Sequence, residues 1–286
     1  MFERAIAGAK LAFKLNAPGR NLKVFSDDAF LVSYPKSGNT WARFLIASAL
    51  RPNEKVDFAN INKIIPGADV VRHRDLLRMP RPRIVKSHQY FDPRYPRVIY
   101  IVRDPRDVAV SQYHFHRKRR LVEADYPLAD FVSRFVAGQV CDYSSWGEHA
   151  ASWLSTRYGQ PGFLLLHYED MLQDTVRELS KIVSFLGLKT SREVINQAVE
   201  RSSADKMRQL EKSQAQLFNG TRNTRQDVTF VRAAKAGGWK SNLAEDLVAK
   251  IEGAWAPLMH YLGYELTTQS APKESGIPFA MQQMPT

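Results

Sequence analysis

The chain has 286 residues, a formal net charge of +12 at pH 7 and 44% hydrophobic residues. So many apolar residues can build a substantial core, which excludes a globally disordered chain. A single cysteine, Cys141, excludes an internal disulfide and indicates a reducing, cytoplasmic location. The positive charge is typical of proteins that bind nucleic acid, an anionic membrane, or an anionic cofactor or substrate, and composition alone does not choose among them.

The two ends of the chain differ in composition from the part between them. Residues 1–25 are basic, and we expect an N-terminal helical segment there, because apolar residues recur at helical spacing. These apolar residues are Phe2, Ile6, Ala9 and Phe13. Packing on the domain is the favoured role of this segment, with peripheral membrane contact as the alternative. It lacks the continuous apolar core of a secretory signal, and no stretch of the sequence is long enough to span a bilayer.

The rest of the chain divides into a domain and a tail. Residues 26–266 form one predicted domain, which is a usual size for a single unit. Residues 267–286 are polar and rich in proline, so we expect a flexible C-terminal tail.

A strand, a tight loop and a helix are predicted where an apolar run from Phe30 ends at Tyr34-Pro35 and helical spacing begins at Trp41. A helix N-terminus presents unpaired backbone N–H groups and the positive end of the helix dipole, so this loop suits an anion. Gly38 lets the backbone approach a phosphate closely. Further loop side chains add one full charge and three neutral donors: Lys36, Ser37, Asn39 and Thr40. The alternative is a capped helix after a strand, with Lys36 in solvent.

Three further strands and several helices are predicted in chain order. The strands lie at residues 83–88, 98–102 and 163–168, and the unbroken apolar run of the second indicates burial on both faces. We expect irregular connections at residues 51–66 and 213–229. Helices are predicted at 41–50, Val108 to His114, Phe131 to Phe135, Trp146 to Trp153, Leu172 to Leu186, 192–211, and 244–261 with an interruption at Pro257. This alternation predicts an α/β fold with a P-loop-like central parallel sheet flanked by helices on both faces.

Polar side chains follow three of the predicted strands. They are Lys36 and Ser37 after the first strand, Lys86 and His88 at the second, and Arg103 and Asp104 after the third. In parallel sheets, ligands bind beyond the carboxyl ends of the strands. The fold would therefore bring two lysines, an arginine and a histidine to one edge, which favours an anion site there.

With these residues in place, the chain resembles the soluble, cytosolic-type sulfotransferases that use 3′-phosphoadenosine 5′-phosphosulfate (PAPS). Four segments carry the resemblance in order: 30–41 as the 5′-phosphosulfate loop, 103–115 as the 3′-phosphate segment, 146–153 with 168–170, and 230–240 as the closing cofactor loop. The similarity runs from about Phe30 to Tyr264. Asn39 stands where threonine is usual.

The resemblance implies in-line transfer of a sulfuryl group from PAPS to a hydroxyl acceptor, with adenosine 3′,5′-bisphosphate (PAP) as the product. His88 is the candidate general base, because an imidazole can take a proton near neutral pH. Lys36 would neutralise the departing phosphate oxygen, and Lys86 would bind the sulfuryl oxygens. The corresponding structural alternatives are a hydrogen-bonded strand-end histidine and solvated lysines. The sulfuryl group carries little charge and no carboxylate cluster stands out, so we expect no metal.

The resemblance also implies a cofactor site. Arg103 and Ser111 would hold the 3′-phosphate, and Trp41 and Tyr168 would contact the adenine. The alternative for Arg103 is a surface salt bridge with Asp104 or Asp107. The whole implied cofactor-binding set is Lys36, Ser37, Gly38, Asn39, Thr40, Trp41, Arg103, Ser111, Tyr168, Ser202, Met207, Arg232, Ala233, Ala234 and Lys235.

Two departures from the family pattern concern the closing loop and the segment after it. The closing loop usually reads Arg-Lys-Gly, and Arg232-Ala233-Ala234 here lacks one positive charge and one glycine. Lys235 would compensate, or cofactor affinity would be lower. The family's dimerisation segment is not kept, because Ala244 and Glu245 replace its Thr-Val pair. The oligomeric state therefore stays open.

Two other functions are compatible with parts of the sequence. Asp104 after an apolar strand is compatible with a P-loop-type kinase, but the loop lacks G-x-x-x-x-G-K-[ST]. Basic clusters are compatible with a nucleic-acid-binding module, although aromatic residues are not interleaved with them: Arg72, Arg74, Arg78, Arg81 and Arg83, and Arg117, Lys118, Arg119 and Arg120. For a sulfotransferase, the acceptor would be a small-molecule or glycosylated hydroxyl compound, bound by loops 53–82 and 212–229.

Overall fold

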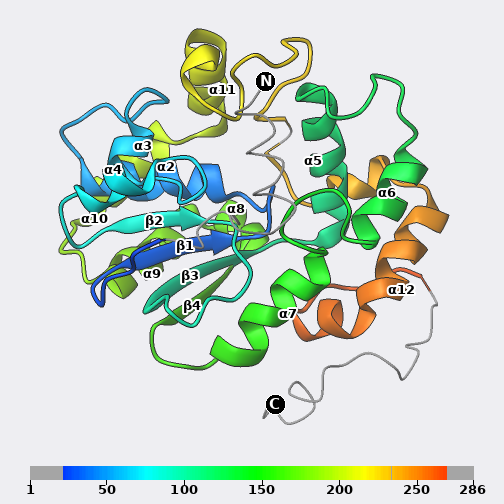
Figure 1. The fold of residues 1–286 in the computed structure, drawn as a ribbon, viewed down its shortest axis with the longest axis horizontal. Coiled ribbons are helices and arrows are strands. Elements are labelled where there is room, and N and C mark those ends of the chain that lie inside the picture. Colours follow the sequence, from blue (N-terminus) through cyan, green and yellow to red (C-terminus); the bar gives the residue numbers. More distant parts are fainter. Residues whose placement is uncertain (1–21, 233, 269–286) are drawn as a thin grey trace, which may run out of the picture.

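A computed structural model describes residues 22–232 and 234–268 of the chain (Figure 1). The apolar residues of the expected N-terminal helical segment lie outside the described residues, and so does the tail from residue 269 onward. The first two tail residues, Thr267 and Thr268, are described, and their backbone N–H groups donate hydrogen bonds to Glu252.

A four-stranded parallel sheet forms the centre of the molecule. Its strands are β1 (Ala29–Ser33), β2 (Ile84–Ser87), β3 (Arg97–Val102) and β4 (Phe163–His167), in the spatial order β2-β1-β3-β4. β1 pairs in parallel with both β2 and β3, with Leu31 opposite Lys86 on one side and Ile99 on the other. The predicted parallel sheet is therefore confirmed, and all four predicted strands are present.

Helices connect the strands and cover both faces of the sheet. Along the chain they are α2 (Asn39–Leu50), α3 (Ile61–Ile64), α4 (His73–Leu77), α5 (Pro105–Lys118), α6 (Leu128–Val136), α7 (Trp146–Arg157), α8 (Tyr168–Gln173), α9 (Thr175–Leu186), α10 (Arg192–Arg201), α11 (Ala204–Gln214) and α12 (Glu245–Tyr261). Short 3₁₀ turns lie at Ala215–Leu217 and Gly238–Ser241.

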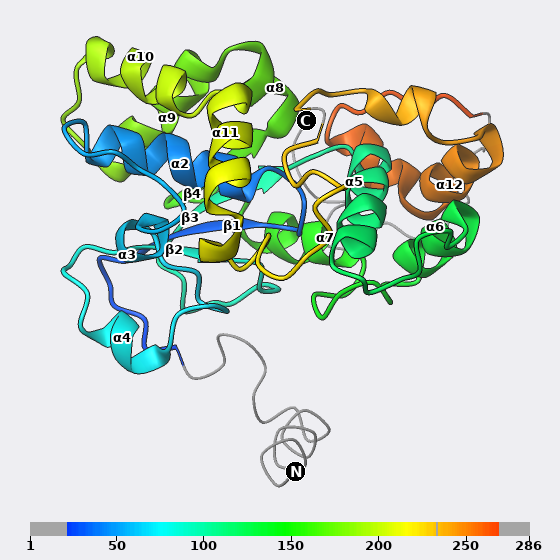
Figure 2. The ribbon, with the colours of Figure 1, turned by 90° about the horizontal axis from the view of Figure 1, so that it is seen from above.

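Alternate residues of the strands enter two separate cores, because successive side chains of a strand point to opposite faces. Leu31 and Ile99 pack with α2, α9 and α10, which lie side by side in Figure 2. Phe30 and Tyr100 pack in the other core, with residues of α5, α6, α7 and α12. A sheet covered on both faces leaves its edges and strand ends as the places where a ligand can bind.

Two helices that were predicted as continuous are each broken by a residue that caps a new helix. Asp174 separates α8 from α9, and its carboxylate accepts a hydrogen bond from the backbone of Arg177 at 2.9 Å. The predicted helix at 192–211 is broken at Ser202 and Ser203, and the Ser203 hydroxyl accepts from the backbone of Lys206. Asp and Ser favour such N-terminal positions because their oxygens satisfy free N–H groups.

Two cations of the basic clusters lie in the interior. Arg83 is fully buried, and its Nε donates to Asp28 at 2.9 Å while its Nη1 donates to the Leu76 carbonyl at 2.8 Å. Lys118 is buried as well, with its Nζ 3.0 Å from a carboxylate oxygen of Glu211. These two residues of the clusters are therefore structural, and they are unavailable to a nucleic acid.

The buried pair of Asp28 and Arg83 should contribute strongly to stability. We expect Asp28→Ala to lower the free energy of unfolding by about 3–5 kcal/mol, because it leaves a buried guanidinium without its carboxylate. Urea denaturation followed by circular dichroism measures this change. The control is Asp27→Ala, which removes the exposed partner of Arg81 and should change stability little. Equal effects of the two substitutions would contradict the prediction.

Candidate active site

A cavity of about 860 Å³ opens at the carboxyl ends of the strands, between the loop after β1, helix α5 and the segment that follows α11. Most of the implied site residues line it: Lys36, Gly38, Asn39, Thr40, Trp41, Lys86, His88, Arg103, Ser111, Tyr168, Met207, Arg232 and Ala234. Lys36, His88 and Arg103, which come from three different strand ends, therefore share one cavity. Ser37, Ser202 and Lys235 do not line this cavity, and Ala233 lies outside the described residues.

The loop after β1 is shaped by two residues in the left-handed region. Lys36 has φ 71° and Gly38 has φ 96°. A Cβ at Gly38 would lie 2.5 Å from Cδ2 of Tyr168, so only glycine fits there. The backbone of the loop can therefore pack directly against the tyrosine ring, and Gly38 directly precedes the first residue of α2.

Several polar atoms around this loop have no hydrogen-bond partner among the described residues. They are Oγ of Ser37, Oδ1 of Asn39 and Nε of Arg103, all of them buried. The amide nitrogen of Asn39 donates instead to the Leu31 carbonyl at 3.2 Å, so this residue ties the loop back to β1. Buried polar atoms rarely remain unpaired in native proteins, which indicates that a polar ligand completes the site.

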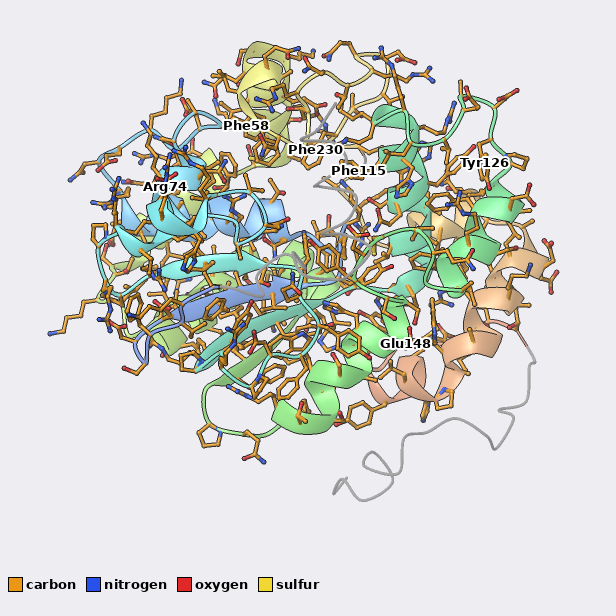
Figure 3. All side chains as sticks on the ribbon, viewed as in Figure 1. Phe58, Arg74, Phe115, Tyr126, Glu148 and Phe230 are labelled. Carbon is orange, nitrogen blue, oxygen red and sulfur yellow. The ribbon has the colours of Figure 1, made fainter. Side chains whose placement is uncertain are left out.

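The ammonium group of Lys36 lies between two aromatic rings. Its Nζ is 4.4 Å from the centroid of Phe115 on α5 and 4.1 Å from that of Phe230. The two rings themselves meet edge to face, and Figure 3 shows their labels next to each other above the sheet. Both residues line the cavity. Burial, and then the positive charge of Arg103, lowers the pKa of Lys36 to about 7. An anion in the cavity would restore the charged form.

Arg103 connects the loop after β1 with the segment after α11. Its guanidinium donates to the carbonyls of Lys36 at 3.2 Å and Lys235 at 3.3 Å, and it stacks 4.2 Å from the ring centroid of Tyr168. It also lies 3.7 Å from a carboxylate oxygen of Asp107. The salt-bridge alternative for Arg103 is therefore present in part, but the pair is buried and not at the surface, and Arg103 itself lines the cavity. Contacts within the protein therefore hold the guanidinium of Arg103 in place, while its Nε has no partner among the described residues.

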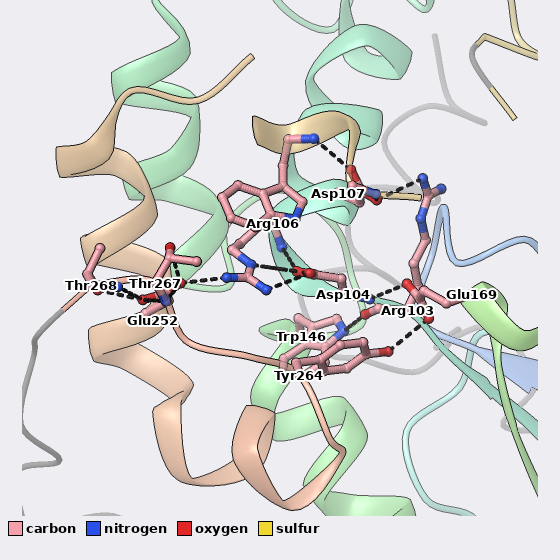
Figure 4. Close-up of polar contacts among 12 residues, drawn as sticks. Arg103, Asp104, Arg106, Asp107, Trp146, Glu169, Glu252, Tyr264, Thr267 and Thr268 are labelled. Carbon is pink, nitrogen blue, oxygen red and sulfur yellow. Dashed lines mark hydrogen bonds and ion pairs between the residues drawn. The ribbon is translucent and has the colours of Figure 1, made fainter. Parts of the chain in front are cut away.

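Buried carboxylates hold the segment at 230–240 in place. Asp107 accepts hydrogen bonds from the backbone of Gly237 at 2.8 Å and of Trp239 at 2.9 Å (Figure 4). Glu211 on α11 accepts from the backbone of Phe230 at 2.6 Å and of Val231 at 3.0 Å. These contacts keep the segment over Lys36 and Arg103.

A second layer of ionic contacts supports the start of α5. Figure 4 shows Arg106 between Asp104 and Glu252, and its guanidinium lies 3.9 Å from the ring centroid of Trp239.

Ala234, where glycine is usual in the resembled family, has φ 49°, a left-handed conformation that costs a non-glycine residue roughly 1 kcal/mol. The loop keeps the backbone shape of a glycine position without having the glycine.

His88 follows β2 and is fixed by hydrogen bonds on two sides. Its Nδ1 lies 2.7 Å from the carbonyl of Ser33, and a carbonyl only accepts, so Nδ1 carries the proton and Nε2 is the basic atom. Its own carbonyl lies 3.1 Å from Nε2 of His149. Burial, and then the positive charge of Lys86, lowers the pKa of His88 to about 3. The imidazole therefore stays neutral throughout the physiological pH range, and without a ligand it is a weaker base than a free imidazole, in contrast to the near-neutral pKa expected from the sequence.

Lys86 is neither solvated nor free. Its Nζ contacts both carboxylate oxygens of Asp69, at 2.8 and 2.9 Å. Sequence reasoning missed Asp69, because the residue lies in a polar connection seventeen positions before Lys86 and nothing in the local pattern marks it. Gln112 was not expected at the site either. Its side chain lines the cavity, and its buried Nε2 has no hydrogen-bond partner in the described part of the chain.

The remaining implied residues support Trp41 and its neighbours. Nε1 of Trp41 donates to the carbonyl of Ser202 at 3.0 Å, and the ring of Trp41 meets that of Tyr168 edge to face. Ser202 is fully buried and contacts the site through this carbonyl. Residues from both expected acceptor loops line the cavity, among them Val70 from the first loop and Asn219 from the second.

Within residues 22–232 and 234–268, no three His, Cys, Asp or Glu side chains gather as potential metal ligands. No helix in these same ranges has the length and apolar character needed to cross a membrane.

The chain matches a known family and several solved structures. The model of the sulfotransferase domain matches residues 26–263. The chain is 31% identical over 231 residues to sulfotransferase 1B1 of Canis lupus familiaris, which covers 75% of this chain and 77% of that protein. It is 33% identical over 227 residues to 3-beta-hydroxysteroid sulfotransferase of Cavia porcellus, and the match covers 76% of this chain and 78% of that protein.

Solved structures have the same fold. Mouse sulfotransferase SULT7A1 complexed with PAP superposes with a TM-score of 0.67 at 24% identity, covering 83% of this chain and 85% of that chain. Retinol dehydratase in a complex with retinol and PAP gives a TM-score of 0.70 at 23% identity, and the match covers 90% of this chain and 87% of that chain. The sulfotransferase-domain model matches residues 26–263, and the sulfotransferases of Canis lupus familiaris and Cavia porcellus are 31% and 33% identical to the chain. The chain therefore belongs to the sulfotransferase family.

Proposed function

We propose that this chain uses PAPS as its sulfuryl donor and transfers the sulfuryl group to a hydroxyl group of a small-molecule acceptor. The observation that carries the proposal is the shared cavity of Lys36, His88 and Arg103 at the ends of parallel strands. Two structures of the same fold are complexed with PAP, which supports the same ligand here. The kinase and nucleic-acid alternatives have no comparable support.

The residues of the loop after β1 fit the phosphosulfate end of PAPS. The hydroxyl of Thr40 and the left-handed Gly38, which both line the cavity, offer a polar contact and a close approach of the backbone. The unpaired Nε of Arg103 and the neighbouring Ser111 fit the 3′-phosphate. Bound PAPS would supply an activated sulfuryl group on a phosphate that is a good leaving group.

The other residues of the cavity would provide the acid–base and electrostatic parts of catalysis. Nε2 of His88 would take the proton of the acceptor hydroxyl, because Nδ1 is already engaged with Ser33. The ammonium of Lys36 would stabilise the charge that develops on the 5′-phosphate. Lys86 would donate to the sulfuryl oxygens. No metal enters this scheme.

The acceptor side of the cavity suits a hydroxyl compound with an apolar body. Val70, Leu121, Val140 and Tyr143 line it together with His88. The ring of Tyr143 lies 5.7 Å from the imidazole of His88, so a flat ring or an alicyclic body would pack there beside the base. A glycosylated acceptor remains the alternative, and the cytoplasmic location remains a prediction.

Substitution of the base tests the proposed reaction. The wild-type protein should transfer ³⁵S-labelled sulfate from PAPS to members of a pooled set of phenols, alcohols and steroids. His88→Ala should lower kcat by roughly 10²–10⁴ and leave PAP affinity within twofold, since the base acts on the acceptor. His73→Ala, an exposed histidine on α4, is the control. Normal turnover by His88→Ala would refute the assignment.

Substitution of Arg103 tests the 3′-phosphate site. Arg103→Ala should weaken PAP binding by about 1.5–3 kcal/mol, which is roughly 10- to 100-fold in Kd, because it removes charged hydrogen bonds. Calorimetry with PAP and with adenosine 5′-monophosphate, which lacks the 3′-phosphate, measures the effect. The loss should be confined to PAP. Arg78→Ala, an exposed arginine, is the control, and an unchanged Kd for Arg103→Ala would contradict the role.

The pKa of Lys36, lowered to about 7, predicts a link between proton uptake and PAP binding. At about pH 8.5 the free enzyme holds mostly the neutral amine, and the bound phosphate favours the ammonium, so binding should take up close to one proton. PAP affinity should therefore fall as pH rises above about 7. Calorimetry in buffers with different ionisation enthalpies measures this uptake, which should disappear in Lys36→Gln. Binding without uptake in the wild type would count against the prediction.

A further inference from the structure

A short segment extends the sheet beyond β2 and brings Asp69 to Lys86. Gly67 forms a parallel bridge with Lys86. The backbone of Lys86 donates to the carbonyl of Pro66 at 2.8 Å, and the backbone of Ala68 donates to the carbonyl of Lys86 at 2.9 Å. Asp69 follows directly, so its position relative to Lys86 is set by backbone hydrogen bonds.

The ion pair between the two side chains is close and shielded. Nζ of Lys86 contacts Oδ1 and Oδ2 of Asp69 at 2.8 and 2.9 Å, and the two side chains are 10% and 22% exposed, respectively. An ammonium has three N–H donors, and two of them are engaged by the carboxylate. One donor remains, and both residues line the cavity that also contains His88.

We propose that Asp69 is a positioning residue for sulfuryl transfer, which fixes the free N–H of Lys86 toward the sulfuryl oxygens and offsets the charge that arises on His88. This inference rests on the proposed function. In the transfer, the acceptor oxygen bonds to sulfur, and the bond from sulfur to the 5′-phosphate oxygen breaks with its electron pair on that oxygen. The acceptor proton moves to Nε2 of His88, which becomes an imidazolium.

The charges around His88 explain why a carboxylate is needed. The positive charge of Lys86 opposes protonation of the imidazole, and the carboxylate of Asp69 favours it. Without Asp69, proton transfer would place a second positive charge next to an unpaired ammonium in a buried site. Such an arrangement is costly, because little solvent is present to screen the repulsion.

Comparison of Asp69→Asn with Asp75→Asn tests the inference. Asp75 lies on α4, six residues further along the same connection, and pairs with Arg72 at the surface. Two acceptors are used with each variant: a neutral alcohol, which needs a base, and an acidic phenol that is already ionised at the assay pH, which does not. PAP affinity is measured by calorimetry as a check that the cofactor site is intact.

For Asp69→Asn, we expect kcat to fall roughly 100-fold with the alcohol and clearly less with the ionised phenol, at unchanged PAP affinity. Asp75→Asn should match the wild type with both acceptors. Wild-type rates for Asp69→Asn would overturn the inference. Equal losses with both acceptors, together with weaker PAP binding, would assign Asp69 a merely structural role and would overturn it too.

A second measurement needs neither cofactor nor turnover. The ¹⁵Nζ resonance of Lys86 in the free enzyme, assigned with Lys86→Arg, can be titrated in the wild type and in Asp69→Asn. Burial lowers the pKa of Lys86 and Asp69 raises it, so the variant should have a still lower pKa. An unchanged titration would overturn the inference. A wild type that binds PAP but transfers no sulfuryl group would instead refute the proposed function, and this titration would still report on Asp69.

Discussion

The repulsion among cations buried around one cavity is the constraint on which the rest of the structure depends. Lys36, Lys86 and Arg103 reach this cavity from three strand ends. The contacts that stabilise each charge differ: Lys36 contacts two aromatic rings, Lys86 pairs with Asp69, and Arg103 contacts Asp107 and a tyrosine ring. The pKa of Lys36 is nevertheless lowered to about 7 by burial and by the charge of Arg103. Compensation by protein groups is incomplete, and an anionic ligand supplies the remainder.

The same carboxylates that offset charge also determine the shape of the site. Asp107 faces Arg103 with one oxygen and still accepts two backbone N–H groups of the segment at 237–239. Glu211 pairs with Lys118 and accepts two backbone N–H groups at 230–231. Charge balance and loop position are therefore coupled, since removal of either carboxylate would release a loop and leave a cation without its partner.

The sequence was informative where local pattern determines structure. Apolar runs located all four strands. Gly38 was singled out because its backbone can approach a phosphate, and the structure adds that a Cβ there would lie 2.5 Å from Cδ2 of Tyr168. Pattern was insufficient where a contact joins distant segments. Asp69 reaches Lys86 only through the bridge at Gly67, and the breaks at Asp174 and Ser203 depend on capping that competes with helical spacing.

The contact of Glu252 with Thr267 and Thr268 has a consequence for where the folded unit ends. The carboxylate of Glu252 is buried, receives the backbone N–H groups of both threonines and pairs with Arg106 at the start of α5. A chain shortened to end at residue 266 would lose these donors and leave an acidic group in the interior with one ionic partner. A shortened chain that keeps the partners of Glu252 would therefore have to include Thr268.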